Sequence, residues 1–169
     1  MTRSAAETTD VVELIIQDHR RMEGLFHAMR SVEADRAAAL REFADLLIAH
    51  GEAEESEVYP ALRRYKKVDD EEVEHGEEEH TEGNKALAAL LEVSEVGSDE
   101  WDEKLEELSE AITHHMDEEE RTLLNHAREL VKDERRAELG AAFVRERDRL
   151  LQQNCGSLEN VRKVIANSE

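Results

Sequence analysis

Apolar residues in this chain recur at spacings of three and four residues, as at Met22, Phe26 and Met29. This spacing lines up one face of an α-helix, whereas a β-strand would scatter the same residues over both of its faces. The chain has one proline in 169 residues, only 4% aromatic residues, and no runs of β-branched residues. With 39% hydrophobic residues, the sequence therefore predicts an all-α fold of single-domain length.

Capping residues and apolar spacing predict five helices followed by a turn and a short final helix. Their expected bounds are 10–32, 35–65, 70–96, 99–131 and 134–153. Pro60 lacks a backbone donor and is expected to kink the second helix. Because the connections are short, we expect residues 1–132 to form an up-down-up-down four-helix bundle. Residues 133–169 are expected to be a C-terminal helical extension that packs on the bundle or on a partner subunit.

The formal net charge of -21 favours cations as partners and disfavours nucleic acid and membrane surfaces. Cys155 is the only cysteine, so an intrachain disulfide is excluded. Glu13 interrupts the apolar run near the N-terminus, and no segment approaches the length of a membrane span. We therefore expect a cytoplasmic protein.

Each of the four predicted bundle helices carries a histidine within its apolar stripe. These histidines are His19, His50, His80 and His115. Glu54 and Glu119 follow two of them by four residues and share their inward face. His114 and Glu118 are rotated about 100° away from that face. Counting residues from each connection places all four inward histidines near mid-height of the bundle.

A single histidine on an apolar stripe is more often a hydrogen-bonded core residue than a metal ligand. Four at one level are different when two carboxylates accompany them, because burying Glu54 and Glu119 without a cation is costly. Imidazole and carboxylate without thiolate suit non-haem iron or manganese, with zinc and copper as alternatives. Two His-x-x-x-Glu pairs on two helices favour a dinuclear site with bridging carboxylates.

Tyr59 is a further candidate, although five residues after Glu54 a regular helix turns it away from the inward face. A kink at Pro60 would bring its hydroxyl toward the site; the alternative is a packed tyrosine with its hydroxyl at the rim. The remaining histidines have simpler interpretations. His27, His75 and His114 are expected to be solvated. His126 is expected to face inward, but about 16 Å along the helix axis from His115, too far to share its site.

The order of these motifs resembles the hemerythrin-like, HHE cation-binding family over residues 10–130. The matching stretches are "DHRRMEGLF", "HGEAEESEVYPAL", "EHTEGNKAL" and "HMDEEERTLL". The resemblance implies a centre of two non-haem iron ions, oxo- or hydroxo-bridged, that meets peroxide, dioxygen or nitric oxide. The implied metal ligands are His19, His50, Glu54, His80, His115 and Glu119, with Tyr59 as the added candidate.

The chain departs from the oxygen-carrying members of that family in two places. They have a second histidine one turn from the first on the third helix, where this chain has Gly76 and Asn84. They also have an aspartate in the fourth-helix pair, where this chain has Glu119. A missing imidazole would leave iron a more open position, which favours redox turnover of peroxide over reversible oxygen carriage.

The leading prediction is therefore a di-iron protein with catalase-like decomposition of hydrogen peroxide. The alternative is a protein that binds or senses oxygen, nitric oxide or iron without turnover. Ferritin-like iron storage is disfavoured, because such sites use Glu-x-x-His on paired helices and that order occurs here only on the third helix. The oxidant, the electron donor and the oligomeric state stay open.

Overall fold

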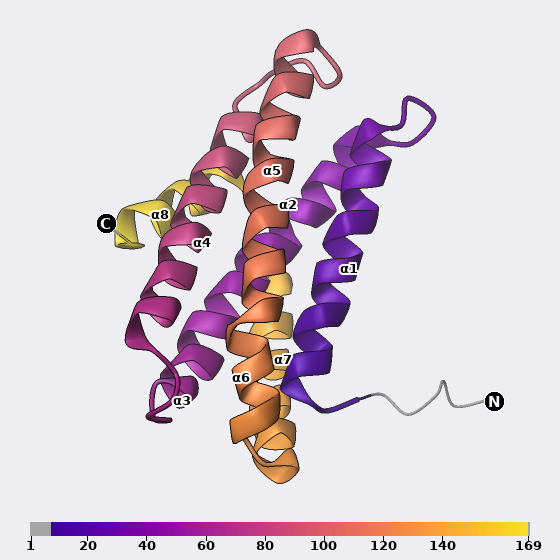
Figure 1. The fold of residues 1–169 in the computed structure, drawn as a ribbon. Helices are drawn as coiled ribbons and strands as arrows, with labels where there is room; N and C mark the ends of the chain where they lie inside the picture. Colours follow the sequence, from indigo (N-terminus) through magenta and orange to yellow (C-terminus); the bar gives the residue numbers. More distant parts are fainter. Residues whose placement is uncertain (1–7, 169) are drawn as a thin grey trace, which may run out of the picture.

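The computed structural model describes residues 8–168, and the all-α prediction is confirmed (Figure 1). The elements are α1 (Val11–Arg30), α2 (Arg36–Ala53), the π-helix η1 (Glu54–Val58), α3 (Tyr59–Leu62), α4 (Asp70–Leu91), α5 (Asp99–Arg121), α6 (Leu123–Leu130), α7 (Asp133–Leu151) and α8 (Leu158–Ser168). Part of the N-terminal segment considered above, residues 1–7, lies outside the described residues. Within the described range, no helix is both long enough and apolar enough to cross a membrane.

Four helical rods form the predicted up-down-up-down bundle: α1, then α2 with η1 and α3, then α4, then α5 with α6 (Figure 1). Helix α1 packs on α2 and α5, and α4 packs on α5 and α2. Side chains cap the start of all four rods by accepting a backbone N–H, which stabilises each helix by about 1 kcal/mol. The capping residues are Asp10, Asp35, Asp69 and Ser98.

Helix α4 ends at Leu91, earlier than predicted. The fourth rod, predicted as one continuous helix, is divided into α5 and α6. At Thr122 the backbone leaves the helical region, with φ −105° and ψ −85°. The Thr122 hydroxyl donates a 2.8 Å hydrogen bond to the carbonyl of Glu118. Such back-bonding to the preceding turn bends helices.

The second rod contains a π-helical turn directly before Pro60, the residue at which the sequence analysis expected a disturbance of the helix. The Tyr59 N–H bonds to the carbonyl of Glu54, five residues back, and the α-helical pattern resumes when the Arg63 N–H bonds to the Tyr59 carbonyl. Pro60 cannot donate, and its ring would collide with the carbonyl four residues earlier in a regular helix, so the ladder slips by one residue. The extra residue returns Tyr59 to the same face as Glu54.

The apolar core lies in two clusters, one toward each end of the bundle. One includes Phe26, Phe43 and Trp101, and the other includes Ile15 and Phe143. Helix α7 packs on α1, α2 and η1, and α8 packs beside α4 (Figure 1). Both extension helices thus contact the bundle of the same chain, whereas a domain boundary at residue 132 stays a prediction.

Candidate metal centre

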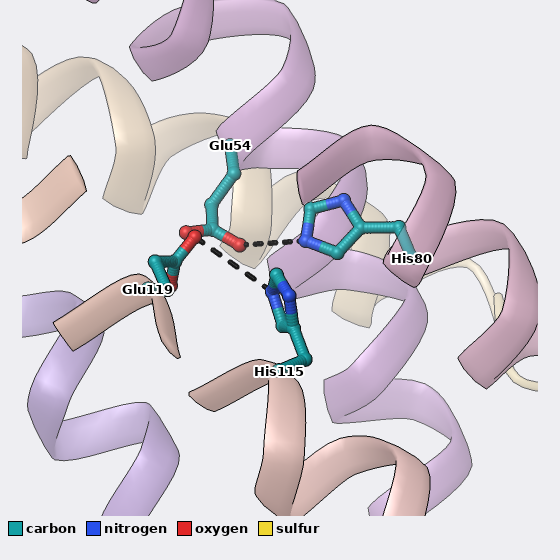
Figure 2. A group of neighbouring side chains, drawn as sticks. All are labelled: Glu54, His80, His115 and Glu119. Carbon is teal, nitrogen blue, oxygen red and sulfur yellow. Dashed lines mark ion pairs between the residues drawn. The ribbon is translucent and has the colours of Figure 1, made fainter. Parts of the chain in front are cut away.

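A buried polar layer separates the two apolar clusters, and all seven predicted site residues lie in it. Each of these residues is no more than 8% exposed to solvent. They come from six elements: His19 (α1), His50 (α2), Glu54 (η1), Tyr59 (α3), His80 (α4), and His115 and Glu119 (α5). Figure 2 shows four of them, with the carboxylates of Glu54 and Glu119 directed toward the rings of His80 and His115.

Glu54 lies between histidines of two different helices. Its Oε1 is 3.0 Å from Nε2 of His50 and 3.2 Å from Nε2 of His80. A single carboxylate therefore joins the α2 side of the layer to the α4 side.

Glu119 likewise lies between histidines of two helices, α1 and α5. Its Oε1 is 3.2 Å from Nε2 of His19, and its Oε2 is 3.8 Å from Nε2 of His115. Ligand atoms within 4.8 Å of one another define two buried groups that share Glu119: Glu54, His80, His115 and Glu119; and His19, His50 and Glu119. The layer thus offers two adjacent cation positions.

Several polar atoms inside the layer make no directed hydrogen bond among the described residues, even where a nitrogen and a carboxylate oxygen lie close together. They are Nε2 of His19, His50 and His115, both carboxylate oxygens of Glu54, and Oε1 of Glu119. A buried polar atom left unpaired costs about 1–3 kcal/mol, so such a group of atoms calls for an explanation. All of them belong to residues of the two groups described above, and cations at those positions would coordinate them. The residues therefore fit a metal centre.

In each of the four imidazoles, Nδ1 donates a hydrogen bond to a carboxylate, whereas Nε2 faces the layer. The Nδ1–carboxylate distances are 2.9 Å for His19 with Glu120, 2.7 Å for His50 with Asp18, 2.6 Å for His80 with Glu55 and 3.0 Å for His115 with Glu79. An ionised carboxylate only accepts, so it fixes the proton on Nδ1 and leaves Nε2 to face the layer as a ligand.

These outer carboxylates follow a circular order around the bundle. Each carboxylate accepts a hydrogen bond from a histidine of a neighbouring helix. The pairs are Asp18 (α1) with His50 (α2), Glu55 (η1) with His80 (α4), Glu79 (α4) with His115 (α5), and Glu120 (α5) with His19 (α1). Sequence reasoning missed all four. The available signal is that each is adjacent in sequence to an inward residue, which places it about 100° around the helix, at the boundary with the next helix.

The carboxylates also set the charge state of the layer. Burial alone would lower the pKa of His50, but Glu54 and Asp18 outweigh it and raise that pKa to about 10. Burial opposes ionisation of Glu54 as well, yet His50 and His80 hold its pKa well below the usual value. A protonated His50 and an ionised Glu54 therefore balance one another within the layer, and a bound metal ion would displace the proton from His50.

Tyr59 is buried within the layer rather than at its rim. Its ring stacks on His80, with centroids 5.5 Å apart, and its hydroxyl donates to Oε2 of Glu119. A Cβ added at Gly76 would lie 3.2 Å from the Tyr59 hydroxyl. The phenol thus fills part of the space beside Gly76 that was expected to be open. Burial raises the Tyr59 pKa well above its usual value, and Glu119 adds to the shift, so the resting hydroxyl is protonated at neutral pH.

The remaining histidines lie outside the buried layer. His27 is exposed, and His126 is half-buried with its Nε2 3.3 Å from Glu72 Oε2. His75 and His114 are exposed as predicted, but each lies close to two carboxylates, a pairing that the sequence analysis did not foresee.

The four-helix bundle and its buried histidine–glutamate layer define a cation-binding helical protein. The family model described as "Hemerythrin HHE cation binding domain" matches residues 10–127. The chain therefore belongs to the hemerythrin HHE cation-binding domain family, as the resemblance predicted. Comparisons with curated proteins and with solved structures gave no match.

Proposed function

We propose that this protein holds two non-haem iron ions in the buried layer and decomposes hydrogen peroxide. The observation that carries the proposal is the pair of adjacent cation positions that share Glu119. His19 and His50 would bind one ion, His80 and His115 the other, and the two glutamates would bridge them. The absence of thiolate from these two ligand groups favours iron or manganese over metals that prefer sulfur.

Peroxide decomposition needs both electron and proton transfer. Bound iron would supply the redox chemistry. Reduction of one peroxide to two waters consumes two protons and two electrons, and oxidation of a second peroxide to dioxygen returns both. Protons must therefore be exchanged locally. The Tyr59 hydroxyl, hydrogen-bonded to Glu119 Oε2, is positioned to give a proton and take it back.

Small molecules have a route to this layer. A cleft of about 530 Å³ opens between α4 and α5 and is lined by His115 and Glu119 of the layer. Its outer walls include Glu79 and Glu118. A neutral molecule of the size of hydrogen peroxide can enter such an acidic cleft without the repulsion that an anion would meet.

The test combines metal analysis with oxygen evolution. Protein purified with iron is expected to hold two ions per chain in the buried layer and to release dioxygen from peroxide much faster than an equal amount of free iron. His115→Asn should lower both quantities, while His27→Asn, at an exposed histidine, should change neither. Turnover no greater than that of free iron would remove the enzymatic function, and a protein that takes up only zinc would remove redox chemistry altogether.

A second candidate function is binding or sensing of oxygen, nitric oxide or iron without turnover. One contact favours it: Arg147 of α7 donates a 2.8 Å hydrogen bond to Asp18, which in turn holds His50. The C-terminal extension therefore touches the layer through this carboxylate, and its Phe143 ring also lies 5.4 Å from the ring of His50. A loaded protein without peroxide turnover, in which nitric oxide changes the protease sensitivity of α7, would support this function over the first.

A further inference from the structure

Four side chains form a second histidine–glutamate group on the surface, between α4 and α5. His75 and Glu79 are four residues apart on α4, and His114 and Glu118 are four residues apart on α5. Each pair therefore lies on one helix face, and the two faces meet where α4 packs on α5. The ligand atoms of all four lie within 4.8 Å of one another.

The two imidazoles and two carboxylates of this group converge on one point. Nε2 of His114 lies 3.2 Å from Glu79 Oε2 and 3.1 Å from Glu118 Oε2. Nε2 of His75 lies 3.5 Å from Glu79 Oε2 and 3.4 Å from Glu118 Oε2. Each carboxylate oxygen is thus shared by both rings, which is the arrangement expected when all four atoms face a common ion.

Glu79 is held in place by a hydrogen bond from a histidine of the buried layer. Oε1 of Glu79 accepts the 3.0 Å hydrogen bond from Nδ1 of His115, so Oε2 is left to face His75 and His114. The Glu79 side chain is only 15% exposed, whereas those of His75 and His114 are 50% and 66% exposed. Two fixed helix faces and an anchored carboxylate therefore preorganise the group, while the imidazoles stay open to solvent.

We propose that His75, Glu79, His114 and Glu118 bind one divalent first-row transition-metal ion, separately from the buried layer. Imidazole nitrogens distinguish the group from a cluster of carboxylates alone, because they favour transition metals over magnesium and calcium. Three members of the group, His75, Glu79 and Glu118, line the acidic cleft that His115 and Glu119 also line, so the group is adjacent to the buried layer. The geometry of this site stands without the proposed peroxide chemistry.

Titration of the iron-loaded protein with Co²⁺ tests the site, because cobalt with imidazole and carboxylate ligands absorbs visible light. We expect one cobalt ion per chain in addition to the buried iron. Changing His75→Ala and His114→Ala together should weaken this binding at least 100-fold, while circular dichroism and the melting temperature stay close to those of the parent. The matched control is His27→Ala, which removes an exposed histidine outside the group and should leave the binding unchanged.

Two results would overturn the proposal: no cobalt bound beyond the buried centre, or equal binding by the parent and the double variant. Resonances of the His75 and His114 rings provide a second measurement, since diamagnetic Zn²⁺ should shift both and leave His27 unmoved. Failure of the buried layer to take up iron would defeat the proposed function but not this site, because the double variant would still lose one ion relative to the parent.

Discussion

The carboxylate of Asp18 lies 2.7 Å from Nδ1 of His50, although the two residues belong to different helices. The same carboxylate accepts a 2.8 Å hydrogen bond from Arg147, 129 residues further along the chain. Residues that contact the histidines from outside therefore belong to the site as much as the inward residues do. Metal affinity should depend on them, because they fix the tautomer and the orientation of each ligand.

Asp18→Ala should lower the affinity for metal about 10- to 100-fold, the effect typical of losing a carboxylate behind a histidine ligand. The His50 Nδ1–H would be left buried without an acceptor, so the protein should also lose about 1–3 kcal/mol of stability. Competition with a coloured chelator measures the affinity. Asp117→Ala makes the same change at an exposed position of α5 and should leave the affinity unchanged. Equal affinities of the two variants would contradict a role for Asp18.

The inward residues of the layer could be predicted from sequence because periodicity alone decides which face of a helix they occupy. Periodicity could not predict that the two surface pairs, His75 with Glu79 and His114 with Glu118, form one group. His75 and His114 are on different helices, and whether they meet depends on which helices are neighbours and how closely their outer surfaces approach, which apolar periodicity does not give. The contact of Arg147 with Asp18 was out of reach for the same reason, since nothing in the sequence places α7.

The position of Tyr59 shows a different limit. The sequence correctly marked Pro60 as a disturbance, but a proline can kink a helix, end it or shift its hydrogen-bond ladder. Only the π-helical turn at Glu54–Val58 adds the rotation that brings the phenol into the layer. Which of these outcomes occurs depends on packing around the proline, so the role of Tyr59 had to remain open at the level of sequence.

Tyr59→Phe should keep the metal content and slow peroxide decomposition about 100-fold or more, the effect of losing a positioned proton donor. The ring would still stack on His80, so the fold should be preserved. Oxygen evolution at equal iron content measures the effect. Tyr65→Phe, at a tyrosine outside the layer, is the control. If a visible absorption band of the iron-loaded parent also disappears in Tyr59→Phe, the phenolate is a ligand; an unchanged rate would exclude Tyr59 from the proton transfer.

Gly76→Ala should disturb the site without weakening the fold. The new methyl group would lie 3.2 Å from the Tyr59 hydroxyl and push it from Glu119. Alanine also favours the helix by up to about 1 kcal/mol over glycine, so the melting temperature should not fall. The peroxide rate should fall toward that of Tyr59→Phe. Gly24→Ala, where a Cβ meets nothing within 4 Å, should gain the same helix stability and keep the full rate. A Gly76→Ala variant with full activity would show that the phenol position is unimportant.

Protein stripped of metal by a chelator should become less stable as the pH rises from 7 to 9. The folded-state pKa of His50, about 10, lies above the unfolded value of about 6.5. The contribution of His50 to stability is therefore complete below about pH 6.5, and it is lost as the pH rises toward the folded-state pKa. The loss is about 1 kcal/mol per pH unit for each proton that the folded state retains and the unfolded state has released. Glu54, whose pKa is depressed, contributes in the opposite sense, and only at acidic pH.

Urea unfolding at several pH values measures the slope, which should be smaller in His50→Gln and unchanged in His27→Gln. A flat profile for the stripped parent would show that its imidazoles are already neutral at pH 7, and then metal binding would release no protons from them.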